Sequence, residues 1–113
     1  MSDNCLFCSI AAGDVAADVV LETDNVVAFR DISPQAPVHV LVIPRKHLEN
    51  VTEAAREMPE VLAEMADVAQ QIADAESGGQ FRWIFNTGAQ AGQIVFHVHG
   101  HVIGGQELGW NPA

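Results

Sequence analysis

The sequence is poor in cations and has no long apolar run, and each scarcity argues against a class of protein. Five Lys and Arg residues stand against 15 Asp and Glu residues, for a formal net charge of −10 over 113 residues. Affinity for a nucleic-acid polymer comes largely from clustered Lys and Arg, so no such polymer is expected as a partner, although a single nucleotide held by backbone amides is compatible with this charge. No segment approaches the roughly 18 apolar residues of a membrane span, and the N-terminus lacks the basic and then apolar layout of a signal peptide. We therefore expect a cytoplasmic protein that is not attached to a membrane.

Cysteine is also scarce. Only Cys5 and Cys8 are present, with the spacing C-x-x-C. A disulfide framework would need more cysteines. The spacing alone leaves three interpretations open, namely half of a zinc site, a redox pair or two incidental thiols.

Hydrophobic residues make up 49 % of the sequence, which is typical of a globular protein, and the length suits a single domain over residues 1–113. Runs rich in β-branched residues predict strands, and apolar residues at three- and four-residue steps predict helix. The predicted elements are a short helix over residues 5–12, strands over 18–22, 25–30 and 38–43, a helical region over 52–76, and strands over 81–85 and 96–103. Their order predicts an α+β fold with an antiparallel sheet of about five strands, one long helix and a short N-terminal helix.

The helical region over residues 52–76 has one apolar side and one acidic side. We interpret the acidic stripe as a solvated face. Pro59 is expected in the first turn of the main helix, where its missing N–H does no harm.

Three of the five histidines, His97, His99 and His101, occupy every second position near the C-terminus. In a β-strand this spacing places all three on one face. The alternate positions are expected to face a core: Phe96, Val98 and Val102, with Gly100 as a gap.

The three histidines admit three interpretations. They could bind a catalytic zinc, one neutral imidazole could act as a nucleophile while its neighbours orient it, or they could be incidental. Chance is the weakest, because histidine is scarce and these three follow strand periodicity. The polar, glycine-containing loop over residues 86–93 can aim backbone N–H groups at an anion, and an attack on phosphorus needs such a cradle. The loop therefore favours nucleophilic phosphate chemistry over metal hydrolysis.

Two isolated residues have ordinary explanations in the sequence. His39 lies in an apolar run, where a histidine is usually a core residue satisfied by a hydrogen bond. Trp110 lies in a tail rich in turn residues and is too large to leave in water without reason. We expect that the tail folds back or packs on another subunit.

The segment His97-Val-His-Gly-His-Val-Ile103 closely resembles the signature of the histidine-triad family, in which the histidines alternate with apolar residues. Further landmarks occur in the order that this family has. They are Asp31-Ile-Ser-Pro-Gln-Ala-Pro37, His39, Pro44-Arg-Lys-His47, Asn86, Gly92-Gln93, Gly104-Gly105 and Trp110. Together they are similar to the Hint branch, the histidine-triad nucleotide-binding proteins, from about Cys5 to the end of the chain.

The resemblance implies a histidine-triad fold and hydrolysis of purine nucleoside 5′-phosphoramidates or aminoacyl adenylates through a nucleotidyl-histidine intermediate. By position, His99 is the expected nucleophile. His101 is expected to contact the phosphate and protonate the leaving amine, and His39 is expected to support the histidine network. No cofactor is expected in catalysis. The alternatives are a nucleotide-binding regulatory protein with little turnover, and a dinucleoside polyphosphate hydrolase or nucleotidyl transferase of a sister branch.

The resemblance also implies how a purine nucleoside monophosphate or phosphoramidate is bound. Asn86, Gly92, Gln93 and the backbone around Ile94 are expected to hold the phosphate, and Asp31 the ribose hydroxyls. The apolar slot for the base is expected to consist of Phe7, Ile10, Phe29, Ile32 and Leu41. The family forms a homodimer with a sheet that continues across the two-fold axis, which would place Trp110 near the partner's site.

Two residues depart from the family pattern. Ile94 stands where many relatives carry a hydroxyl residue, so the activation of the leaving group or its identity can differ. Gly100 replaces an apolar residue, with an expected effect on packing.

Some bacterial-type members bind a structural zinc through residues that match Cys5, Cys8, His47 and His97. A Cys₂His₂ set is a normal closed tetrahedral site. The resemblance therefore favours a structural zinc among the three interpretations of the cysteines, with His97 as a ligand.

Overall fold

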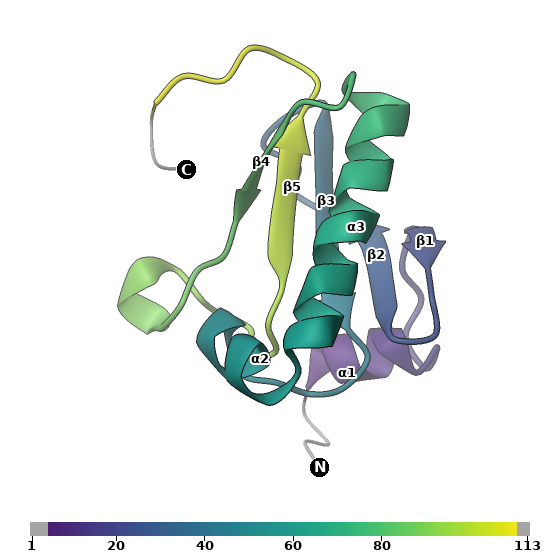
Figure 1. Cartoon of the computed structure of the whole chain (residues 1–113), viewed down its shortest axis with the longest axis vertical. Helices are drawn as coiled ribbons and strands as arrows, with labels where there is room; N and C mark the ends of the chain where they lie inside the picture. Colours follow the sequence, from purple (N-terminus) through teal and green to yellow (C-terminus); the bar gives the residue numbers. More distant parts are fainter. Residues whose placement is uncertain (1–4, 111–113) are drawn as a thin grey trace.

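The computed structural model describes residues 5–110 and contains one antiparallel sheet with helices on both faces (Figure 1). The strand order is β1-β2-β3-β5-β4. The strands are β1 (Val19–Glu22), β2 (Val26–Arg30), β3 (Val38–Pro44), β4 (Phe81–Ile84) and β5 (Gly100–Gly104). The helices within the described residues are α1 (Leu6–Ala11), α2 (Val51–Glu57), α3 (Pro59–Glu76) and the 3-10 turn η1 (Ala89–Ala91). The predicted α+β fold with a five-stranded antiparallel sheet is confirmed.

Strand β3 is the centre of the sheet, because it pairs with β2 on one side and β5 on the other. All seven of its residues are buried, as its apolar run predicts. Side chains alternate between the two faces of a strand. Val38, Val40 and Val42 therefore pack with α3, whereas Leu41 and Ile43 lie on the opposite face in a cluster with residues of α1.

Helix α3 covers one face of the sheet and lies in front of β3 in Figure 1. Its apolar stripe is buried against the valines of β2, β3 and β5 and consists of Val61, Met65, Val68, Ala69 and Ile72. On the other face, α1 contributes the buried ring of Phe7, whose centroid lies 5.5 Å from that of Phe29. Within residues 5–110, no helix has the length and apolar character needed to cross a membrane.

The predicted helical region is two helices with a break at Met58. Met58 has φ −144° and ψ 64°, outside the helical range. A residue that precedes proline is pushed out of the helical conformation, and Pro59 starts α3 as expected. The first of these two helices, α2, begins at Val51 and is capped by Asn50, whose side chain accepts a hydrogen bond of 2.9 Å from the Glu53 N–H.

The predicted strand over residues 96–103 is wrong at its start, because β5 begins at Gly100. Before it, the Val98 N–H donates to the Leu48 carbonyl at 2.7 Å, so the main chain takes a partner outside the sheet. Phe96 is 43 % exposed and does not face the core as predicted. The alternation itself persists, since Val98 and Val102 join the clusters on the α3 side of the sheet.

Gly100 leaves room for a large side chain from the neighbouring strand. A Cβ atom built on Gly100 would lie 2.3 Å from Trp83 Nε1 and 2.7 Å from Phe85 Cζ. The indole of Trp83 thus fills the gap that the sequence predicts in the packing face. The expectation that this departure affects packing agrees with the structure.

Candidate functional site

The candidate site lies on the face of the sheet opposite α3. His101 pairs with Leu41 of β3 and with Ile84 of β4, so these side chains share one face. A cleft of about 420 Å³ opens there, lined by Gln35, His39, Ile84, Asn86, Ala91, Gly92, His101 and Ile103. The cleft therefore brings two of the predicted catalytic histidines together with the predicted phosphate loop.

His99 is held so that one ring nitrogen is available for chemistry. Its Nδ1 lies 2.8 Å from the carbonyl oxygen of His97, and the carbonyl can only accept, so Nδ1 carries the proton. Nε2 then keeps its lone pair. Burial lowers the pKa of His99, and the ring of Phe7 stands edge-on to it with centroids 5.0 Å apart. His99 is thus a neutral imidazole at physiological pH, which is the form that attacks phosphorus.

His39 and His101 form a hydrogen-bonded pair beside a carboxylate. His39 Nε2 lies 2.9 Å from His101 Nδ1 and 3.4 Å from Asp31 Oδ2. Burial, with the neighbouring His99 and His39, lowers the pKa of His101 to about 4. An anionic phosphate in the cleft would raise this pKa, because an opposite charge favours the protonated ring.

The loop between β4 and the histidine segment is held in shape by Gln93. This side chain is 2 % exposed, accepts from the Gly88 N–H at 2.9 Å and donates to the Glu49 carbonyl at 2.7 Å. Gly88 and Gly92 have φ of 90° and 95°, which favour glycine. Asn86 donates to the Ala91 carbonyl at 2.9 Å. Asn86, Ala91 and Gly92 line the cleft, whereas the side chain of Gln93 does not line it and is hydrogen-bonded to main-chain groups.

The residues expected to surround the base are spread over the α1 side of the sheet. Phe7, Phe29 and Leu41 are buried in one cluster, and Ile10 packs against it. Ile32 is 99 % exposed and Ile94 is 86 % exposed. Neither of these two lines the cleft.

Sequence reasoning did not identify several residues of the cleft. Ile103 could have been found, because it follows His101 by two positions and so shares its face. Ile84 could have been found only with the register of β4 against β5. Gln35 had no signal in the sequence, since its main chain approaches the site through the turn over residues 33–37.

Cys5, Cys8, His47 and His97 lie together in a second cluster. The ligand atoms are close: Cys5 Sγ and His97 Nδ1 are 3.3 Å apart, Cys8 Sγ and His47 Nδ1 3.3 Å, and the two Nδ1 atoms 3.3 Å. A tetrahedral zinc, with bonds of about 2.0–2.3 Å, separates its ligand atoms by roughly 3.3–3.8 Å. The observed spacing fits that geometry.

The hydrogen bonds and burial around these four residues also suit a metal ion. His97 Nε2 donates to the Pro44 carbonyl at 2.8 Å, which leaves Nδ1 as the ligand atom. Burial and the nearby Cys5 raise the pKa of the Cys8 thiol to about 11, and burial lowers the pKa of His97 to about 4. A bound cation would favour the thiolate, so metal binding there would release protons. The cluster can therefore hold a metal ion.

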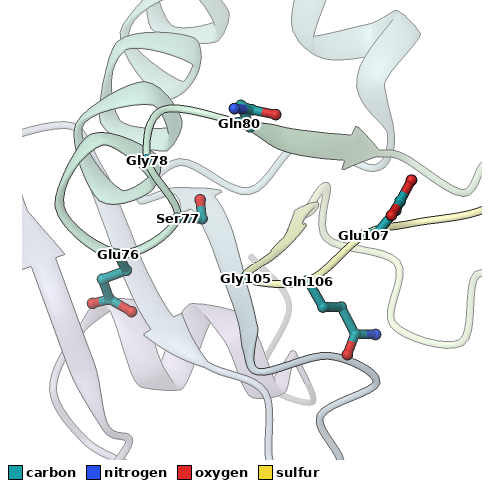
Figure 2. Close-up of a pocket in the computed structure, with 7 residues that line it drawn as sticks. All are labelled: Glu76, Ser77, Gly78, Gln80, Gly105, Gln106 and Glu107. Atoms are coloured by element: carbon teal, nitrogen blue, oxygen red, sulfur yellow. The ribbon is translucent and has the colours of Figure 1, made fainter.

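A larger hollow of about 580 Å³ lies elsewhere on the surface and shares no lining residue with the histidine cleft (Figure 2). It lies where the end of α3 meets the segment after β5, and its lining consists of Glu76, Ser77, Gly78, Gln80, Gly105, Gln106 and Glu107. It contains no histidine, and one of its carboxylates, Glu76, is paired with Arg30 at 2.8 Å. The chemistry is therefore assigned to the smaller cleft, which His39 and His101 line. His99 is buried and is not among its lining residues, but its ring centroid lies 5.1 Å from that of His101.

Comparison with known proteins identifies the family of the chain. The family model of the HIT domain matches residues 12–108. The chain belongs to the HIT family. Cys5 and Cys8 lie before the matched region, whereas the three histidines of the triad lie within it.

Similar HIT proteins cover nearly the whole chain. Purine nucleoside phosphoramidase of Escherichia coli K12 is 40 % identical over 111 residues, which are 96 % of this chain and 93 % of that protein. An uncharacterized HIT-like protein of Synechocystis is 41 % identical over 99 % of both chains. The crystal structure of a HIT family hydrolase from Legionella pneumophila has a TM-score of 0.91 and 43 % identity, over 97 % of this chain and 100 % of that one.

Proposed function

We propose that this HIT protein hydrolyses purine nucleoside 5′-phosphoramidates or aminoacyl adenylates through a nucleotidyl-His99 intermediate. The observation that carries the proposal is the hydrogen bond from His99 Nδ1 to the His97 carbonyl. This bond places the ring proton on Nδ1 and leaves His99 Nε2 with a free lone pair. The similarity to a protein named purine nucleoside phosphoramidase supports this choice of substrate. The expectation that no cofactor takes part in catalysis belongs to the same proposal.

The reaction has two steps. His99 Nε2 attacks phosphorus and forms a P–N bond to the ring, while the bond from phosphorus to the leaving amine breaks. His101, protonated in the complex because the anionic phosphate raises its pKa, delivers a proton to that amine and is left neutral. Water then attacks phosphorus and gives up a proton to His101 while the P–N bond to His99 breaks, which releases the nucleoside monophosphate and returns His99 to its neutral form.

The substrate would be held by groups of the cleft and its rim. Asn86, Gly92 and the backbone of Gln93 and Ile94 hold the phosphate, with Asp31 on the ribose hydroxyls. The base would lie against the apolar cluster on the α1 side and cover the exposed side chain of Ile32. The slot consists of Phe7, Ile10, Phe29, Ile32 and Leu41.

The test is a substrate panel that compares cleavage of P–N and P–O–P bonds, with His99→Ala as the matched variant. We expect faster turnover of adenosine phosphoramidates than of dinucleoside polyphosphates, and a loss of about 10⁴-fold or more in kcat for His99→Ala. Mass spectrometry of quenched wild-type protein should find a nucleotidyl adduct on His99. Wild-type turnover by His99→Ala would reject the nucleophile.

A second candidate function is that of a nucleotide-binding regulatory protein with little turnover. Ile94 favours it, because an isoleucine offers no hydroxyl to the bridging atom of the substrate. Calorimetry that finds tight binding of a nucleoside monophosphate, together with no cleavage of any phosphoramidate, would select this function. Preferred cleavage of P–O–P bonds would instead select the dinucleoside polyphosphate hydrolase or the nucleotidyl transferase.

The proposal includes a structural zinc at Cys5, Cys8, His47 and His97, and a homodimer in the cytoplasm. Zinc there would hold α1 against the segment that carries His99. Trp110 is 90 % exposed, and a second copy of the chain would bury it. Strand β4 is an edge strand, and the second copy would pair with it. Sedimentation equilibrium tests the dimer, and elemental analysis of protein purified without chelator tests the zinc.

A further inference from the structure

The turn before β3 places one main-chain donor against His39. The Gln35 N–H lies 3.0 Å from His39 Nδ1. A main-chain amide can only donate, so Nδ1 must offer its lone pair. The proton of the neutral ring is therefore on Nε2.

This protonation state is passed on to His101. His39 Nε2 lies 2.9 Å from His101 Nδ1, and with the proton on Nε2 it is the donor. His101 Nδ1 therefore accepts, and the proton of the neutral His101 ring is on its own Nε2. Asp31 Oδ2, at 3.4 Å from His39 Nε2, is a second acceptor and favours the same tautomer of His39.

We propose that the main-chain N–H of Gln35 is a positioning group that sets the tautomers of His39 and His101, so that His101 presents an N–H to the bound substrate. The role of that proton rests on the proposed function, whereas the tautomers themselves do not. Gln35 is exposed and has no catalytic side chain, but its main-chain N–H thus sets which ring nitrogens of His39 and His101 donate and which accept.

The turn is braced so that this amide stays in place. The Ser33 N–H donates to Asp31 Oδ1 at 2.7 Å, and the Gln35 side chain donates to the Ser33 carbonyl at 3.0 Å. Pro34 and Pro37 flank Gln35 and restrict the backbone on both sides. The Asp31 N–H also donates to the His39 carbonyl at 3.0 Å, which ties the turn to the start of β3.

The same tautomer disfavours a metal ion at Asp31, His39 and His101. Their ligand atoms lie within 4.8 Å of one another, as a metal site requires. Ligation by His39 Nε2, however, needs a lone pair where this tautomer has a proton, and the other tautomer would set two N–H groups against each other at Nδ1. Added zinc is therefore expected at the cysteine cluster and not at this triplet.

The test is the protonation of the histidine rings, read by long-range ¹H–¹⁵N correlation spectra of the full chain at a pH where the rings are neutral. We expect His39 Nδ1 and His101 Nδ1 to resonate as unprotonated nitrogens. Gln35→Pro removes the N–H, and Gln35→Ala keeps it while removing the side chain. The proline variant should populate the other tautomer of His39, and the alanine variant should not.

Kinetics adds a second measurement. Relative to Gln35→Ala, Gln35→Pro should lose about 10- to 100-fold in kcat for a phosphoramidate with little change in KM, because proton delivery and not binding is affected. A wild-type spectrum with a protonated His39 Nδ1 overturns the inference, and so does a folded proline variant that keeps the wild-type tautomer. If the proline variant does not fold, the wild-type spectrum decides. If no phosphoramidate is cleaved but the expected tautomers are found, the proposed function fails while the assignment of Gln35 stands.

Discussion

The contact between Gly100 and Trp83 predicts that Gly100→Ala destabilises the protein. In an open strand the same change would be favourable by about 0.5–1 kcal/mol, because alanine loses less backbone entropy than glycine on folding. Here the new Cβ would lie 2.3 Å from Trp83 Nε1 and 2.8 Å from Trp83 Cε2. The sign of the effect therefore reports on the contact.

The magnitude follows from how little room the neighbours have to move. Strand β5 is hydrogen-bonded to β3 on one side and to β4 on the other. Its backbone therefore cannot shift away from Trp83 without breaking these hydrogen bonds. Overpacking of this kind costs about 1–3 kcal/mol, which exceeds the entropic gain. We expect a net loss of about 1–2 kcal/mol in the free energy of unfolding, or roughly 5–10 °C in Tm.

The assay is urea unfolding followed by far-UV circular dichroism at one protein concentration, with Trp83→Leu and the double variant completing a cycle. Trp83→Leu removes the obstructing ring and also its Nε1, a buried donor without a partner within the described residues. Gly100→Ala should then cost less in the Trp83→Leu background, with a coupling energy of about 1 kcal/mol or more. Stabilisation by Gly100→Ala in the wild-type background would refute the argument.

Three further changes test the metal cluster, the nucleophile and an ion pair. Cys8→Ser should abolish bound zinc and lower Tm by about 10 °C or more, and a chelator should lower the Tm of the wild-type protein but not that of the variant. Because burial lowers the pKa of His99, its neutral form persists below pH 6.5, so kcat/KM should stay flat as the pH falls through 6.5; a loss of activity with a midpoint there would contradict this account. Arg30 lowers the pKa of the Glu76 carboxyl, so this pair stabilises the fold above the unfolded pKa near 4.5 and loses its effect as the pH falls through the lower folded value. Glu76→Gln should therefore lower the free energy of unfolding by about 0.5–1 kcal/mol at pH 7, a small value because Arg30 is partly exposed to solvent. At pH 2 it should not change the free energy of unfolding, and unfolding measured at both pH values checks this.

Prediction from sequence succeeded where the local pattern of apolar residues matches the burial in the folded protein. The apolar run of β3, the amphipathic stripe of α3 and the position of Pro59 are all properties of neighbouring residues. It failed at the ends of elements. The strand over residues 96–103 begins only at Gly100, because the Val98 amide pairs with Leu48, far away in the chain. The break at Met58 was signalled by Pro59, which forces its predecessor out of the helical conformation.

The sequence by itself determined which residues alternate between the faces of the sheet, and it contained the landmarks of the HIT family. It could not assign separate contacts to the three histidines of the triad. His97 meets Cys5, 92 positions away, and His101 meets His39, 62 positions away. The ring of His99 is set by the carbonyl of His97, two positions before it. Only the tertiary structure decided these contacts, because the direction of a hydrogen bond depends on which donors and acceptors the fold brings within about 3 Å, and not on their order in the chain.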